Sequence, residues 1–398
     1  MILVLSLIVA SPWVVDNVQV QIGDGRVQAH SRVVVNNGRI QAVGEQAPIP
    51  PGALVIDGKN RILTPGLIES QSQLGTSEVG METSTNDDAL HNNVFTPAFR
   101  VAEGFNANSV RIPIAREEGI TSTVVAPSGP FIAGSGAWVD LGLEPHASGP
   151  IALFGGIGES AASALGGARG GIWLRLRQVL AEARFLQAHR AAVDHGDARP
   201  LAENIAQLEA LAPILERTQS LILEAHRSSD ILQAIDFAQK ENLKIIISGA
   251  TEAWRVGPQL AKAHVPVILV RPSEQNLGSF EALAVREDAA ALLHHAGVTV
   301  VLSASGSDQN IRRLRQEAGT AVANGMPHQA ALQAITLNAA QIYGQAKDLG
   351  SVQPGKRANL VLWSGDPFEL SSIAERVWVD GEPMSLETRQ KQLAKRYL

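Results

Sequence analysis

The stretch Leu63-Thr-Pro-Gly-Leu-Ile-Glu-Ser-Gln-Ser-Gln-Leu-Gly75 decides how the chain is interpreted, because an apolar run ends there in alternating polar side chains. In an extended strand, side chains two residues apart share one face, so Gln71 and Gln73 point to the same side. Their amides are neutral, whereas zinc in proteins prefers imidazole nitrogen, thiolate or carboxylate. The stretch therefore predicts a strand with a polar end that is poorly suited to holding a metal ion.

The composition is that of a large α/β protein. Its 398 residues, 45% of them hydrophobic, can bury a sizeable core, and one barrel with a smaller satellite is the natural division. A net charge of -6 without basic clusters predicts no binding to nucleic acid. The chain has no cysteine, which excludes disulfides, thiolate nucleophiles and cysteine-bound zinc.

The first residues form the apolar run MILVLSLIVASP at positions 1–12, with no Lys or Arg before it. The run is too short to span a bilayer as a helix, which needs about 20 residues, so we expect no transmembrane span there. Its length and its small final residues favour a signal segment and export to the periplasm. The alternative is an opening buried strand in a cytoplasmic protein.

Both ends of the chain carry short strands with turn signals, such as Asn36-Asn-Gly38 and Asp380-Gly381. Neither end makes a stable sheet alone, so residues 13–62 and 349–384 are predicted to share one β-sandwich, followed by a helix or tail over 385–398.

Between these ends, residues 63–348 alternate β-branched runs with amphipathic helical stretches, which predicts βα units of a TIM-type barrel. The glycine-rich residues 126–137 are expected to form a connecting loop, with an anion-binding nest as the alternative. In such barrels, functional residues sit at the carboxyl ends of the strands. The expected strands are 121–126, 151–154, 221–224, 244–247, 267–270 and 298–302.

Several motifs together resemble the amidohydrolase superfamily. Besides the stretch at 63–75, the chain has Asn37-Gly-Arg-Ile-Gln-Ala-Val-Gly44, the helix Ala334-Ile-Thr-Leu-Asn-Ala-Ala-Gln-Ile-Tyr-Gly344 and the run Leu349-Gly-Ser-Val-Gln-Pro-Gly-Lys-Arg-Ala-Asn-Leu-Val-Leu-Trp363. The run Glu224-Ala-His-Arg-Ser-Ser-Asp-Ile231 resembles a motif of the imidazolonepropionase-like and prolidase-like members. The resemblance covers nearly the whole chain and implies a hydrolase that acts on carbon-nitrogen bonds.

The resemblance also implies positions for a binuclear metal centre, and other residue types stand at all five of them. They are Gln71, Gln73, Glu224, Gly249 and Ser305. Because metal affinity depends on the type and number of ligands, the replacements predict that no cofactor is bound. A single divalent ion such as zinc stays compatible with the carboxylates and histidine present.

The remaining polar residues define the candidate site. Glu224 and His226 are the candidate catalytic bases, and Asp308 is a third candidate if its loop folds inward. The predicted substrate-binding residues are Gln71, Gln73, Arg227, Glu252 and Ser305. A purely structural interpretation is an ion pair between Arg227 and Asp230 beside a rim histidine.

The sequence is compatible with three functions. The first is a hydrolase of amide or small peptide-like substrates with a metal-poor or metal-free site. The second is a catalytically inactive binding protein with the same barrel pocket, and the third is a structural or assembly scaffold. We expect a small-molecule ligand as partner, and the sequence is compatible with a homo-oligomer.

Overall fold

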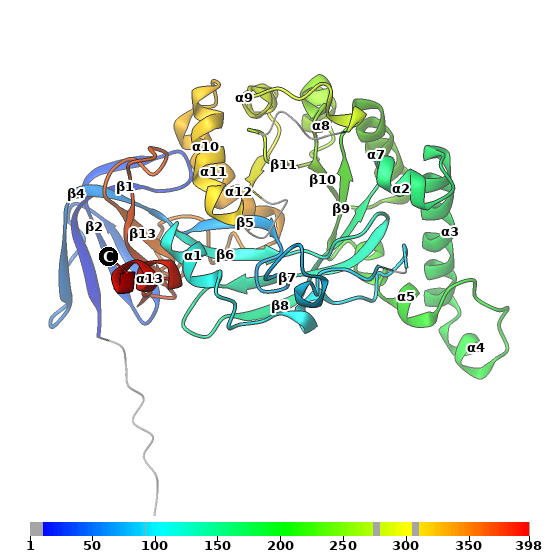
Figure 1. Cartoon of the computed structure of the whole chain (residues 1–398), viewed down its shortest axis with the longest axis horizontal. Coiled ribbons are helices and arrows are strands. Elements are labelled where there is room, and N and C mark those ends of the chain that lie inside the picture. Colours follow the sequence, from blue (N-terminus) through cyan, green and yellow to red (C-terminus); the bar gives the residue numbers. More distant parts are fainter. Residues whose placement is uncertain (1–10, 92, 274–278, 305–309, 398) are drawn as a thin grey trace, which may run out of the picture.

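The structure is a computed structural model that describes residues 11–91, 93–273, 279–304 and 310–397. It contains two sheets (Figure 1). The predicted signal segment falls mostly on residues 1–10, which lie outside the described part. No helix in the described ranges is long and apolar enough to cross a membrane.

One sheet has seven strands in the order β15-β14-β13-β4-β1-β2-β3. Its strands are β1 (Trp13–Gln21), β2 (Val27–Asn36), β3 (Arg39–Gly44), β4 (Leu54–Pro65), β13 (Leu360–Trp363), β14 (Ala374–Val379) and β15 (Glu382–Pro383). The central contact is between β4 and β13, which pair antiparallel with Leu362 opposite Leu63. The two ends of the chain thus share a sheet, while the second layer that a sandwich requires is not confirmed.

The other sheet has eight strands in the order β12-β11-β10-β9-β8-β7-β6-β5 and forms a nearly closed barrel. Its strands are β5 (Leu67–Ser72), β6 (Ile120–Val125), β7 (Ile132–Asp140), β8 (His146–Gly156), β9 (Ser220–Ala225), β10 (Ile245–Gly249), β11 (Val267–Val270) and β12 (Val300–Ser303). Side chains join its ends, because Ser303 Oγ and Ala304 N donate to the Glu69 carboxylate over 2.5 and 2.9 Å.

Strand β7 departs from the parallel barrel that the sequence predicted. It pairs antiparallel with both β6 and β8, and it covers residues that were expected to form a loop. Its glycines are explained by close packing. A Cβ on Gly136 would lie 2.4 Å from the ring of Phe154, and one on Gly134 would lie 2.5 Å from the carbonyl oxygen of Phe99.

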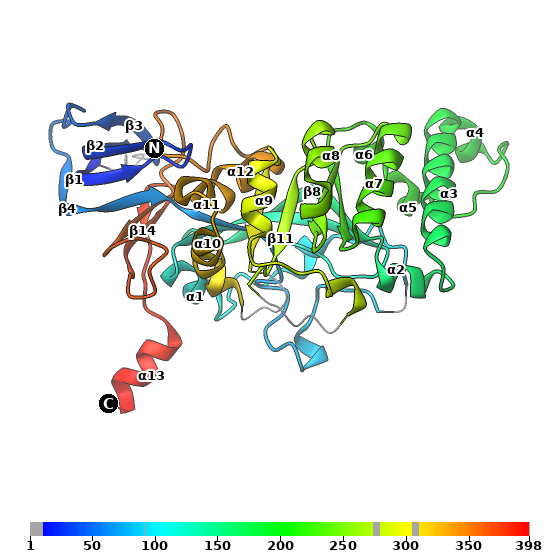
Figure 2. The ribbon, with the colours of Figure 1, turned by 90° about the horizontal axis from the view of Figure 1, so that it is seen from above.

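Helices α7 to α12 line the side of the barrel formed by β9 to β12 (Figures 1 and 2), and α13 extends away from the body of the molecule in Figure 2. The helices are α1 (Ile112–Glu117), α2 (Glu159–Ala164), α3 (Arg169–Ala188), α4 (Arg190–His195), α5 (Ile205–Glu209), α6 (Ala212–Leu215), α7 (Ser228–Glu241), α8 (Gly257–Lys262), α9 (Ala289–His295), α10 (Leu314–Ala323), α11 (His328–Ala334), α12 (Leu337–Ile342) and α13 (Arg389–Tyr397). Short 3-10 turns are η1 (Thr83–Thr85), η2 (Val101–Gly104), η3 (Ala253–Val256), η4 (Phe280–Ala282) and η5 (Asn310–Arg313).

Apolar side chains of the strands pack inside the barrel. The strands supply Ile222, Ile246, Ile268 and Val301, all buried, while the alternate residues of the same strands pack with the surrounding helices. Side chains two residues further along each strand share the interior face. That face therefore continues toward the carboxyl ends of β9 and β10 with Glu224 and Ser248.

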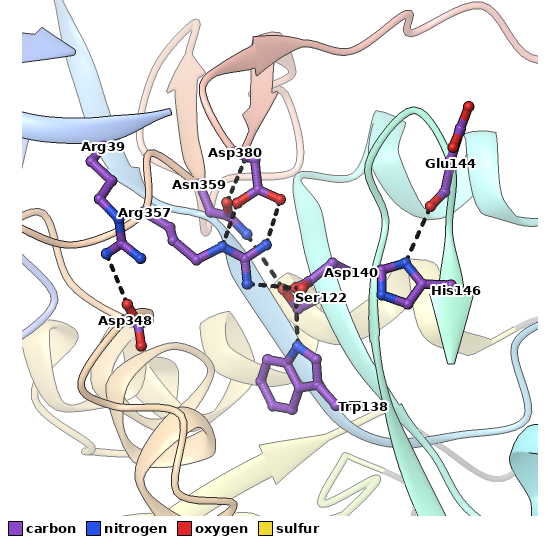
Figure 3. A network of polar contacts seen from close by, with 10 residues as sticks. All are labelled: Arg39, Ser122, Trp138, Asp140, Glu144, His146, Asp348, Arg357, Asn359 and Asp380. Atoms are coloured by element: carbon purple, nitrogen blue, oxygen red, sulfur yellow. Dashed lines mark hydrogen bonds and ion pairs between the residues drawn. The ribbon is translucent and has the colours of Figure 1, made fainter. Parts of the chain in front are cut away.

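A polar network fastens the seven-stranded sheet to the barrel (Figure 3). Arg357 forms ion pairs with Asp140 at the end of β7, over 2.8 Å, and with Asp380 after β14. Asn359 Oδ1 accepts a hydrogen bond from Asp380 N over 2.8 Å. The Arg357 side chain is only 21% exposed, so this junction is a structural contact between elements far apart in sequence.

Candidate active site

A cavity of about 570 Å³ opens at the carboxyl ends of β5 and β8 to β11. Among the side chains that line it are Gln71, Gln73, Glu224, His226 and Ser248. Functional sites of barrels lie at this end of the strands. The structure thus brings together, around one space, four residues that the sequence proposed for the site.

Glu224 and His226 both line this cavity and contact each other. His226 Nε2 lies 3.3 Å from Glu224 Oε1, and His226 Nδ1 lies 2.8 Å from Thr251 Oγ1. The hydrogen bond from His226, with the charges of His226 and Arg271, holds the pKa of Glu224 below its usual value although burial works in the opposite direction. Glu224 is therefore a carboxylate at neutral pH.

Gly249 makes room for the imidazole of His226. Its φ of +79° lies in the left-handed region, and a Cβ built there would lie 2.6 Å from His226 Cε1. A side chain at this position requires His226 to move. The family resemblance implies a metal-binding histidine at position 249, and here the ring of His226 occupies the adjoining space instead.

The two glutamines of β5 differ in their contacts. Gln71 Oε1 accepts a hydrogen bond from Ser248 Oγ over 2.8 Å, which fixes the amide orientation across the barrel. Gln73 Nε2 donates to Asp88 and to Ser128, each over 2.7 Å. Because both donor positions of Gln73 are used within the protein, Gln71 is the better placed of the two to donate to a bound ligand.

Arg227 and Glu252 lie at the start of α7. Glu252 accepts hydrogen bonds from Ser228 N and Ser228 Oγ, over 2.9 and 2.8 Å. Burial opposes ionisation, but these bonds and the charges of Arg255 and Arg227 lower the pKa of Glu252 overall. Of the described residues, the cavity wall includes neither Arg227 nor Glu252. Glu252 thus accepts hydrogen bonds from the amino end of helix α7.

The carboxylate of Asp230 pairs with Arg169 over 2.8 Å, so the sequence-based ion pair with Arg227 is not the arrangement observed. Arg169 also pairs with Glu281, which lines the cavity and accepts from Glu159 N. Sequence reasoning missed this cluster, because 61 and 112 residues separate Arg169 from its two partners.

Glu69 was also not identified from the sequence as a buried carboxyl group with a raised pKa. It is fully buried, and burial raises its pKa to about 7 against the hydrogen bonds from Ser303, Ala304 and Gln71. The negative charge of Glu317 adds to the rise. A carboxylate inside the apolar run of β5 was the available signal, since such groups are rarely buried without a partner.

Ser305 and Asp308 lie outside the described residues. Among the residues that the structure does describe, no group of three or more His, Asp or Glu side chains is arranged to hold a metal ion.

Comparisons with known proteins agree with this architecture. Residues 191–384 match the model of the amidohydrolase family. The structure resembles that of an amidohydrolase from Thermotoga maritima MSB8, with a TM-score of 0.85 and 26% identity, covering 94% of this chain and 99% of the other. A prolidase complexed with N-methylphosphonate-L-proline has a similar fold, with a TM-score of 0.57, 17% identity and coverage of 94% and 100%.

A curated relative, "Amidohydrolase tasK" from Hapsidospora irregularis, is 21% identical over 392 residues, or 88% of this chain. The chain spans only 39% of the length of that relative. The chain thus matches the amidohydrolase family model over 191–384 and shares its fold with solved amidohydrolases.

Proposed function

We propose that the protein hydrolyses carbon-nitrogen bonds of small amide or peptide-like substrates by a route without a binuclear metal centre. The observation that carries this proposal is the contact of Glu224 with His226 in a cavity at the carboxyl ends of the barrel strands. The match to the amidohydrolase family model and the likeness to a solved amidohydrolase support hydrolysis as the reaction type. We take the substrate class from the resemblance to the prolidase-like and imidazolonepropionase-like members.

The described side chains do not fit a binuclear zinc site. The carboxamides of Gln71 and Gln73 are held by hydrogen bonds within the protein, and Gly249 has no side chain and is packed against His226. Glu224 and His226 at the end of β9 are of a suitable type, and they contact each other. Two zinc ions require more ligands of the preferred types than this arrangement offers.

The proposed chemistry uses groups of the chain alone. A carboxylate or imidazole of the pair takes a proton from water, and the water oxygen forms the new bond to the substrate carbonyl carbon. Ser248 fixes Oε1 of Gln71, which leaves the Nε2 hydrogens to donate to the carbonyl oxygen as negative charge develops on it. The carbon-nitrogen bond then breaks, and the departing amine takes the proton from the base.

The test is turnover by protein dialysed against a chelator, screened with cyclic amides and dipeptides. The double variant Glu224→Gln with His226→Asn should lower the rate by a factor on the order of 10² to 10⁴ with the fold intact. Arg39→Met, an exposed change in the sheet, is the matched control and should leave the rate unchanged. Turnover that survives in the double variant would end this proposal.

The second candidate is a binding protein with no turnover. Residues without a side chain that transfers protons at neutral pH stand at three strand-end positions, which supports this candidate. They are Gln71, Gln73 and Gly249. It predicts ligand affinity that the double variant changes, with no hydrolysis by the unmodified protein.

A further inference from the structure

The hydrogen bonds around His226 fix where its protons lie. An ionised carboxylate only accepts hydrogen bonds, so His226 Nε2, 3.3 Å from Glu224 Oε1, must carry the hydrogen of that contact. In a neutral imidazole the other nitrogen, Nδ1, then has no hydrogen. It accepts from the Thr251 hydroxyl, which lies 2.8 Å away. Thr251 is buried, so this donation is shielded from competing water.

The protonated form of His226 also has no nitrogen free to act as a base. In the imidazolium both nitrogens carry hydrogens, Nδ1 donates to Thr251, and Nε2 still donates to Glu224. In neither form does His226 present a lone pair to the cavity. The space that Gly249 leaves, where a Cβ would touch the ring, holds the imidazole in this orientation.

Glu224 has the opposite character. Its side chain is 61% exposed within the wall of the cavity, whereas that of His226 is 21% exposed. One carboxylate oxygen contacts His226. Within the described part of the chain the other has no hydrogen bond or ion pair, so it can meet a water or ligand molecule.

We infer that Glu224 is the base of the site, and that His226 and Thr251 are positioning residues that orient it. The role of Glu224 rests on the proposed hydrolase function, whereas the positions of the protons do not. Thr251 was not singled out by its sequence context, because its contact with His226 joins the ends of two strands, β9 and β10.

Two single variants distinguish the members of the pair. His226→Gln keeps a hydrogen-bond donor but has no group that titrates, so turnover should stay within about tenfold of that of the unmodified protein. Glu224→Gln removes the base and should lower turnover by a factor on the order of 10² to 10⁴. If His226→Gln lost as much turnover as Glu224→Gln, the assignment of Glu224 as the only base would be wrong.

A spectroscopic test reads the proton positions without any substrate. In protein labelled with ¹⁵N in histidine and treated with chelator, the His226 signal is identified by its loss in His226→Gln. When the ring is neutral, this signal should show the form protonated at Nε2. Thr251→Ser, which keeps the hydroxyl, should preserve this form. Thr251→Val has nearly the same shape without the donor and should lower its population.

The two tests fail separately. A His226 signal of the form protonated at Nδ1, or one that Thr251→Val leaves unchanged, would overturn the positioning role of Thr251. Absence of turnover in every protein would reject the proposed hydrolase and with it the role of Glu224, while the spectra would still decide the proton positions.

Discussion

Glu69 makes the stability of the barrel depend on pH. The pKa of this buried carboxyl is about 7 in the folded chain against 4.5 for the exposed group. Each pH unit between two such values corresponds to about 1.4 kcal/mol, so ionisation of Glu69 costs the folded state about 3.5 kcal/mol. Because the pKa of Glu69 is raised in the folded chain, protonated Glu69 contributes to the free energy of unfolding. This contribution is fully present below pH 4.5 and is lost as the pH rises through 7.

The assay compares the free energy of unfolding by urea for the unmodified protein and Glu69→Gln, from about pH 4 to pH 9. The variant keeps a neutral side chain of similar shape that can still accept from Ala304 N. The advantage of the variant should therefore grow by about 3.5 kcal/mol between pH 4.5 and about 8 and stay constant outside that window. A difference that does not change with pH, or that falls as the pH rises, would refute the reasoning.

Two further substitutions test packing, each with a matched control, by the same unfolding measurement. Arg357→Met leaves two carboxylates at the junction without their cation and should cost about 2 kcal/mol or more, whereas Arg39→Met at a more exposed pair should cost less than about 1 kcal/mol; equal costs would contradict the role of the junction. Gly249→Ala should cost about 1 to 3 kcal/mol more than Gly344→Ala, since both glycines have positive φ but only the first would press against His226. Similar losses at the two glycines would show that His226 moves aside freely.

Local signals predicted much of the fold. Asn-Gly hairpins and β-branched runs lie in short windows of sequence, and the strands expected near 121–126 and 221–224 appear as β6 and β9. Strand β7 could not be predicted in this way. Its glycines favoured a loop, and the reason for them is the approach of Phe99 and Phe154, which belong to other parts of the chain.

Part of the candidate site was also predictable from local sequence signals. Glu224 and His226 stand in a recognisable run at the end of a strand, and the structure brings them into one cavity. The partners that determine their behaviour, Thr251 for His226 and Ser248 for Gln71, are 25 and 177 residues away in sequence. Spacing along the chain carries no information about such contacts until the strands are placed side by side.

We propose that this barrel does not use a binuclear metal centre. The most direct test counts the metal ions bound per chain in protein purified without added metal or chelator, and locates any ion by structure determination. We predict no tightly bound pair of zinc ions at the barrel mouth. Close to two equivalents of zinc per chain, coordinated around Glu224 and His226, would contradict it.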